Sequence, residues 1–116
     1  MFIDISMNEE ELIEFIVKAI SGSKELWRTI TNGVMEIDVV KNEDFDESKL
    51  VHFYRKGFLY SRYYLDIEPN ENVEQKDYIE HIGNLLKRLW ETEFKAIAAC
   101  DFEEELPRKG GREKIS

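Results

Sequence analysis

The feature of this sequence that most constrains its fold is the run GFLYSRYYLDIEPN, residues 57–70. It begins at a glycine, ends at Pro69-Asn70 and is rich in aromatic and β-branched residues, which is typical of a long strand. Alternate side chains of a strand point to opposite faces of its sheet. The face predicted to join the core carries Leu59, Ser61, Tyr63, Leu65 and Ile67. The opposite face carries Phe58, Tyr60, Arg62, Tyr64 and Asp66. Because this second face combines aromatic with charged residues, we expect any specific function to involve it.

Two amphipathic helices are predicted, one on each side of this strand in the sequence. The first spans about 8–21: Asn8 and Glu11 are spaced as a capping box, and the apolar residues that follow repeat at helical spacing. The second spans about 73–91, with Asn72 and Gln75 as a capping pair. Gly83 lies in the middle of this helix, where glycine costs up to about 1 kcal/mol relative to alanine. We therefore expect Gly83 to allow the close approach of a neighbouring segment.

Three further strands are predicted from alternating or buried apolar patterns, at 2–6, 34–41 and 95–101. For each of two further segments, the sequence allows two interpretations. Residues 23–30 fit either a short helical turn or the start of a strand. Residues 50–54 fit either a backward extension of the long strand, broken by a turn or bulge near Lys56-Gly57, or a separate short strand.

The predicted order of elements is strand, helix, strand, strand, helix, strand. Two helices can each bury one apolar stripe if they lie side by side on one face of the sheet. Right-handed crossovers then give an α+β fold of the ferredoxin-like βαββαβ type, with a four-stranded antiparallel sheet and two helices on one face. In this arrangement the first and last strands are neighbours and the long third strand is central. We expect residues 1–107 to form a single α+β domain and 108–116 to form a flexible basic C-terminal tail.

Composition restricts the classes of partner. The chain has 116 residues and a net charge of −9, and because 108–116 contribute +3, residues 1–107 carry −12. Nucleic acids and anionic membranes both require a basic surface, so neither is an expected partner. No apolar run approaches the roughly 18–20 residues of a membrane span. With a single cysteine and no signal-peptide pattern, the expected compartment is the cytoplasm.

No motif in the sequence predicts an enzyme or a bound cofactor. The histidines, His52 and His81, have no partner at metal-ligand spacing, and Cys100 lies in an alanine-rich run typical of an unreactive thiol. Asp4, Asp66 and Asp101 fall near strand ends and could in principle attract a hard cation. No calcium-loop motif fixes their spacing, so no metal site is predicted.

The aromatic face has a structural and a functional interpretation. The structural one is a homodimer in which Phe58, Tyr60 and Tyr64 of two copies cover each other, since large apolar patches are seldom left exposed. The layout resembles that of RNA-recognition modules, but the sequence has no RNP-type motif. The functional interpretation is a binding surface, with the candidate residues Phe58, Tyr60, Arg62, Tyr64, Asp66 and, on the neighbouring strand, Asp38.

A second candidate surface is acidic and consists of Asp101, Glu103, Glu104 and Glu105. Such a surface suits docking to a basic protein, because complementary charge steers association. The first functional hypothesis is therefore a small acidic, non-enzymatic protein-binding domain, in its most concrete form a toxin-neutralising inhibitor that behaves as immunity proteins or antitoxins do. The alternative is a small ligand-binding domain or enzyme that uses the open aromatic face, where Arg62 would hold an anionic group.

Overall fold

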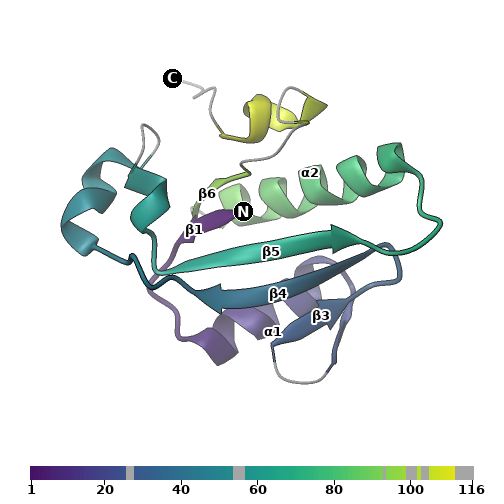
Figure 1. Ribbon diagram of the computed structural model, residues 1–116, viewed down its shortest axis with the longest axis horizontal. Coiled ribbons are helices and arrows are strands. Elements are labelled where there is room, and N and C mark those ends of the chain that lie inside the picture. The colour runs from purple at the N-terminus through teal and green to yellow at the C-terminus, as the bar shows by residue number, and fades with distance from the viewer. Residues whose placement is uncertain (26–27, 54–56, 93, 99–101, 103–104, 112–116) are drawn as a thin grey trace.

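Figure 1 shows the computed structural model of the chain. The structure describes residues 1–25, 28–53, 57–92, 94–98, 102 and 105–111. The helices are α1, Glu9–Ala19, and α2, Gln75–Glu91. The strands are β1 (Phe2–Asp4), β2 (Ser23–Lys24), β3 (Thr29–Thr31), β4 (Met35–Lys41), β5 (Tyr63–Pro69) and β6 (Lys95–Ile97). Within the described ranges, short 3₁₀ segments include η1 (Glu47–His52), η2 (Gly57–Tyr60) and η4 (Pro107–Gly111). No helix in the described part of the chain is long and apolar enough to cross a membrane.

The strands form one six-stranded antiparallel sheet in the order β2-β3-β4-β5-β1-β6. The class α+β is confirmed, whereas the predicted four-stranded ferredoxin-like sheet is wrong. The difference lies in residues 23–31, where β2 and β3 pair with each other and extend the sheet beyond β4. Ile30 gives this hairpin an anchor, because it is fully buried in the core. The predicted neighbours β1 and β6 are indeed paired, and β5 lies in the interior of the sheet.

Both helices pack on the same face of the sheet, where they build the main hydrophobic core. The sequence explains α1 locally: the Asn8 side chain accepts a hydrogen bond from the backbone N–H of Glu11 at 2.9 Å, as predicted. In β4 the burial alternates along the strand, so only the side facing the helices is covered. Fully buried core residues from the two helices and the sheet include Ile3, Leu12, Ile16, Ile37 and Leu86.

The long predicted strand at 57–70 is shorter in the structure, where β5 spans only Tyr63–Pro69. Before it, residues Gly57–Tyr60 form η2, and the Asn42 amide donates hydrogen bonds to the carbonyls of Leu59 and Ser61 at 2.9 and 2.8 Å. These carbonyls are thus used within a loop and not in a strand ladder. Both predictions for residues 50–54 were a strand, and both are wrong for the described residues of this range, because η1 continues to His52.

A second, smaller core lies on the opposite face of the sheet, over β1 and β6. Phe53 and Phe58, which are 1% and 4% exposed, pack there on Ile97, with Phe2 and Leu50 at the margin. The ring centroids of Phe2 and Phe58 lie 5.3 Å apart in an edge-to-face arrangement. Residues of η1 and η2 and Phe53 therefore cover this face beside β1 and β6, while Glu36, Asp38, Asp66 and Glu68 on β4 and β5 stay exposed.

The C-terminal segment η4 lies along the outer side of β6 and against α2. The backbone N–H of Ala98 donates to the carbonyl of Gly110 at 2.8 Å. Pro107 lies on Gly83, where an added Cβ would be 3.1 Å from the proline Cδ. The close approach predicted at Gly83 is thus confirmed. Of the predicted tail, residues 108–111 lie in this packed segment, and 112–116 fall outside the described residues.

Candidate functional site

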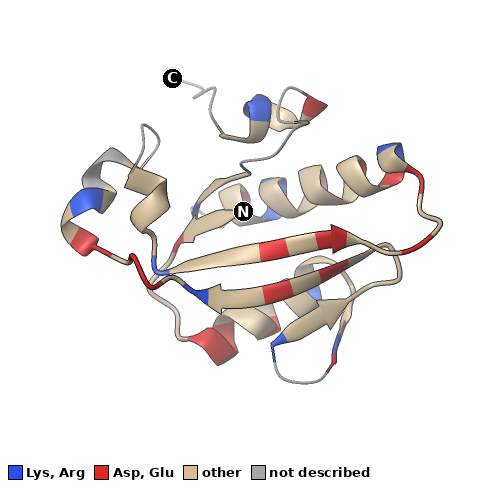
Figure 2. Ribbon diagram, viewed as in Figure 1, with Lys and Arg blue, Asp and Glu red and all other residues tan. Residues whose placement is uncertain are grey.

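Two paired strands of the sheet carry four carboxylates on one face. In the register of β4 and β5, Asp38 lies directly opposite Asp66 and Glu36 directly opposite Glu68. All four residues are exposed, and they alternate along the strands with residues that pack in the main core, so they lie on the side of the sheet away from the helices. Figure 2 shows the acidic positions of β4 and β5 in red. Directly opposite side chains in an antiparallel pair have Cβ atoms about 4.5–5.5 Å apart. We call this group of Glu36, Asp38, Asp66 and Glu68 the acidic sheet face.

No cation balances the acidic sheet face within the described part of the chain. The ion pairs formed by described residues involve other carboxylates, and two of these pairs join Glu9 to Arg28 and Lys41 at 2.7 and 3.9 Å. Lys41 is exposed at the end of β4, but it turns to Glu9 at the start of α1. The Thr29 hydroxyl is a neutral partner of the face and donates a hydrogen bond to Asp38. The local field over these two strands is therefore negative.

The arrangement carries a cost for folding. Like charges placed directly opposite each other on a sheet destabilise it, by amounts of the order of 0.2–1 kcal/mol per pair. Two such pairs are adjacent here, at Asp38–Asp66 and Glu36–Glu68. Neutral or oppositely charged residues at these exposed positions would form the same strands without this repulsion. A group of charges of this kind is better suited to attracting a cationic partner than to stabilising the fold.

The structure brings together some of the residues predicted as a binding surface and separates others. Asp38 and Asp66 are directly paired, and Tyr64 is two residues from Asp66 on the same face of β5. The Tyr64 ring is partly buried and lies 5.9 Å from Phe2. Phe58 is buried in the smaller core, so it does not share an open surface with these residues.

Tyr60 and Arg62 precede β5 and contact the loop that follows β4. The Lys49 ammonium lies 4.1 Å from the centre of the Tyr60 ring, and the Arg62 guanidinium lies 4.4 Å from the centre of the Phe45 ring. Cation–π contacts of this kind contribute about 0.5–1 kcal/mol at exposed sites. In the structure, both predicted binding residues thus help to hold the 42–62 segment together.

The predicted acidic docking surface lies largely outside the described residues. This holds for Asp101, Glu103 and Glu104, while Glu105 is exposed just before η4. A different acidic loop is well defined at Asp46, whose carboxylate accepts a hydrogen bond from the Ser48 hydroxyl at 2.6 Å. This hydrogen bond, with help from the Ser48 backbone N–H and from Lys49, lowers the pKa of Asp46.

The carboxylates considered for a cation are not gathered in the structure. In the β1–β5 register Phe2 lies opposite Tyr64, so Asp4 and Asp66 are displaced in opposite directions, by about 13 Å along the strands. Asp101 is outside the described residues. Among the described residues, no group of three or more histidine, cysteine or acidic side chains has a geometry that could hold a metal ion.

Of the two histidines and the cysteine, His81 is the one whose side chain the structure describes. His81 lies in α2, with its Nδ1 atom 3.2 Å from the Asn32 side-chain amide. The His52 side chain and Cys100 are not among the described parts of the chain. Nothing in the described geometry therefore assembles a nucleophile and a base.

The predicted binding set omitted two members of the acidic sheet face, Glu36 and Glu68. A sequence signal for them exists, because Glu36-Ile37-Asp38 and Asp66-Ile67-Glu68 each place two carboxylates on one face of a strand. Their alignment, however, depends on the register between β4 and β5. No protein-family model, curated protein or solved structure matches the chain. The interpretation of the site consequently depends on its own residues.

Proposed function

We propose that this chain is a non-enzymatic protein-binding domain that docks a basic partner on the acidic sheet face. The observation that carries the proposal is the direct pairing of Asp38 with Asp66 and of Glu36 with Glu68. A cationic surface with lysine or arginine side chains at strand-pair spacing would remove the repulsion within both pairs. Docking would thus gain the attraction across the interface and relieve a cost already present in the free domain.

The most concrete form of this function is inhibition of a toxic protein, as in immunity proteins or antitoxins. Proteins that act on nucleic acids present basic clefts, and a compact negative surface suits them because it competes with the phosphate backbone. The net charge of −9 adds a long-range contribution that would speed encounter with such a partner at low ionic strength. The cytoplasm, expected from the sequence, is the proposed site of action.

The alternative from the sequence, a small ligand-binding domain or enzyme on an open aromatic face, has less support. It would use Tyr60, Arg62, Tyr64 and Asp66, but the Tyr60 ring contacts Lys49 and the Arg62 guanidinium lies over the Phe45 ring. The homodimer expected through Phe58, Tyr60 and Tyr64 stays a prediction. Sedimentation of the wild type and of Tyr60→Glu tests it, and the Glu variant should lower the mass if this surface joins two copies.

The docking proposal is tested by two variants of equal net charge. The face variant combines Glu36→Gln, Asp38→Asn, Asp66→Asn and Glu68→Gln. The control variant changes four exposed glutamates elsewhere to glutamine, namely Glu14, Glu43, Glu71 and Glu80. Each variant has a net charge of −5 because it removes four negative charges from −9. Any difference between them therefore reports the position of the charges and not their number.

Each protein is used as bait for basic proteins in cell extract, at low and at high salt. We expect the wild type and the control variant to retain the same partner at low salt, the face variant to lose it, and high salt to release it. The captured partner is then assayed for nuclease activity with and without each bait. Equal capture by the two variants, or no partner at low salt, would refute docking on this face. Capture without inhibition would keep the docking surface and reject the inhibitor role.

A further inference from the structure

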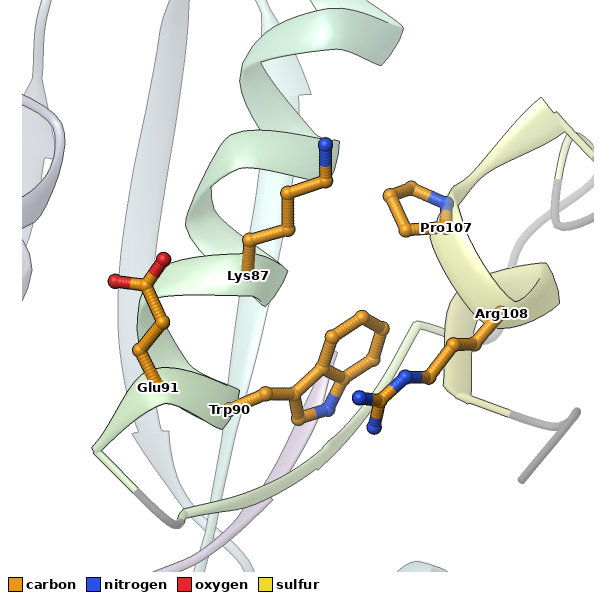
Figure 3. Close-up of a pocket in the computed structure, with 5 residues that line it drawn as sticks. All are labelled: Lys87, Trp90, Glu91, Pro107 and Arg108. Carbon is orange, nitrogen blue, oxygen red and sulfur yellow. The ribbon is translucent and has the colours of Figure 1, made fainter. Parts of the chain in front are cut away.

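A second feature lies away from the acidic sheet face, between the end of α2 and η4. It is a cavity of about 450 Å³ lined by Lys87, Trp90, Glu91, Pro107 and Arg108 (Figure 3). This volume lies within the roughly 300–1,000 Å³ of small-molecule sites. Its walls come from two segments that are distant in sequence, so the site exists only when η4 is packed on the helix.

The cavity presents two positive charges beside flat apolar walls. The Arg108 guanidinium lies 4.7 Å from the centre of the Trp90 ring, and the Lys87 ammonium lies nearer Pro107, at the opposite end of the space from the guanidinium (Figure 3). Among the described residues neither cation forms an ion pair. The third charged residue, Glu91, points away from Pro107 and Arg108, and its carboxylate lies 3.8 Å from Arg88. The charged side chains that line the space are thus two cations and one carboxylate, in a chain whose net charge is −9.

The indole contributes its apolar ring and no free donor. Its Nε1–H already donates to the carbonyl of Ala96 at 3.2 Å, which fixes the orientation of the ring. The Pro107 ring forms a second rigid apolar wall. A ligand that matches these walls has a flat ring, and a ligand that matches the cations has an anionic group that contacts one of them.

The segment that supplies Arg108 is held in a costly backbone conformation. Arg108 and Lys109 both have positive φ, at 51° and 50°, a region that non-glycine residues seldom occupy. Residues in such conformations persist where surrounding structure fixes them, and they cluster at ligand sites. Here the fixing contacts are Pro107 on Gly83 and the closely packed glycines Gly110 and Gly111 on β6. The left-handed turn directs Arg108 over the indole, so the cavity is preformed.

We propose that this cavity binds a small molecule that combines a planar ring with a carboxylate or phosphate group. The ring packs between Trp90 and Pro107, and the anionic group accepts hydrogen bonds from Arg108, while Lys87 adds a second positive charge at the Pro107 end. Lys87 and Arg108 are both exposed, and a hydrogen bond from either to an ionised acceptor is stronger than one between neutral groups. The proposal is independent of docking on the acidic sheet face, because it uses a different part of the molecule.

The test follows the indole N–H signal of Trp90 by NMR, assigned by its loss in Trp90→Phe. Two probes carry both chemical parts, adenosine 5′-monophosphate for a phosphate and indole-3-acetate for a carboxylate. Adenosine, indole, inorganic phosphate and acetate carry one part each. We expect one of the two-part probes to shift the Trp90 signal and the amide signals of 87–91 and 107–111, and the one-part compounds to bind at least about tenfold more weakly.

Charge-neutral variants decide whether the two cations form the site. Lys87→Gln and Arg108→Gln keep much of each side chain and remove its charge, and either should weaken binding by about tenfold or more. Lys76→Gln is the control, because Lys76 is exposed on the same helix, about 16 Å away along its axis. The preferred probe identifies the anionic group. No shift with either two-part probe, equal binding of the one-part compounds, or unchanged binding in both pocket variants would overturn the proposal.

Discussion

At the scale of single residues, two glycines with positive φ differ in how closely their neighbours pack. Comparing an alanine substitution at each separates the free energy of the steric contacts of η4 from the free energy of the unusual backbone conformation. Gly33 and Gly110 have φ of 87° and 75°. An added Cβ at Gly33 would meet nothing within 4 Å, whereas at Gly110 it would lie 2.7 Å from the Ala98 carbonyl oxygen. We predict that Gly33→Ala costs about 1–2 kcal/mol of unfolding free energy for the backbone conformation alone. Gly110→Ala should cost roughly 1–3 kcal/mol more, because backbone atoms must also move apart.

Urea denaturation of both variants measures this difference directly. A larger loss in Gly110→Ala means that the packing of η4 on β6 contributes to global stability. Equal losses would mean that η4 can leave the sheet edge without unfolding the domain. The proposed cavity between α2 and η4 would then open in solution.

Residue-level features were predictable where their cause is local in sequence. The Asn8 cap follows from a spacing of three residues, and the structure confirms it. The predicted cap at Asn72 and Gln75 fails: α2 starts after Glu74, no side-chain hydrogen bond caps it, and Asn72 has a φ of 64°. Gly83 signalled a close neighbour, but that this neighbour is Pro107 depends on how the chain returns to the helix.

At the scale of elements, the smaller core predicts that the residues of η1 and η2 unfold together with the rest of the domain. If these residues are part of the cooperative domain, Phe58→Ala should cost about 3–5 kcal/mol, as in other buried positions. The adjacent Leu59 is 44% exposed, so Leu59→Ala is the matched control and should change stability by less than about 0.5 kcal/mol. Thermal and chemical unfolding measure both. A small loss in Phe58→Ala would show that these residues open separately from the six-stranded sheet.

The elements themselves were predictable to the extent that their periodicity is long. Both helices and the strand at 35–41 repeat an apolar pattern over several turns or pairs, and they lie near the predicted bounds. The hairpin of β2 and β3 has only two and three residues per strand, too few for a period to be recognised. The sequence 57–62 has the composition of a strand, yet Phe58 gains more by packing on Phe53 and Phe2 than by continuing the ladder.

The acidic sheet face is a property of two elements together. Each strand shows its own pair of carboxylates in the sequence, at 36 and 38 on β4 and at 66 and 68 on β5. A shift of register by one residue would send one pair to the other face. The pairing that defines the face is therefore fixed by the hydrophobic residues behind it, Ile37 opposite Ile67 and Val39 opposite Leu65. No local pattern in the sequence predicts this register between β4 and β5.

At the scale of the whole molecule, the length over which charges interact can be compared with the size of the domain. The domain measures 40 × 30 × 23 Å. The Debye length is about 30 Å at 0.01 M salt and about 8 Å at 0.15 M. At low salt most charges on the molecule therefore interact with one another, and the excess of negative charge makes the net interaction repulsive. At physiological salt only neighbouring charges do, such as those across the β4–β5 pair.

This comparison gives a final prediction for the two charge variants, the face variant and the control variant. At about 0.01 M salt both should be more stable than the wild type, because each removes four of the repelling charges. At about 0.15 M the control variant should return to wild-type stability, while the face variant should keep a gain of roughly 0.4–2 kcal/mol from its two relieved pairs. Thermal unfolding over a salt series measures both effects. Identical salt curves for the two variants would mean that the paired carboxylates are no more strained than any others, which would remove the energetic reason for a cationic partner on this face.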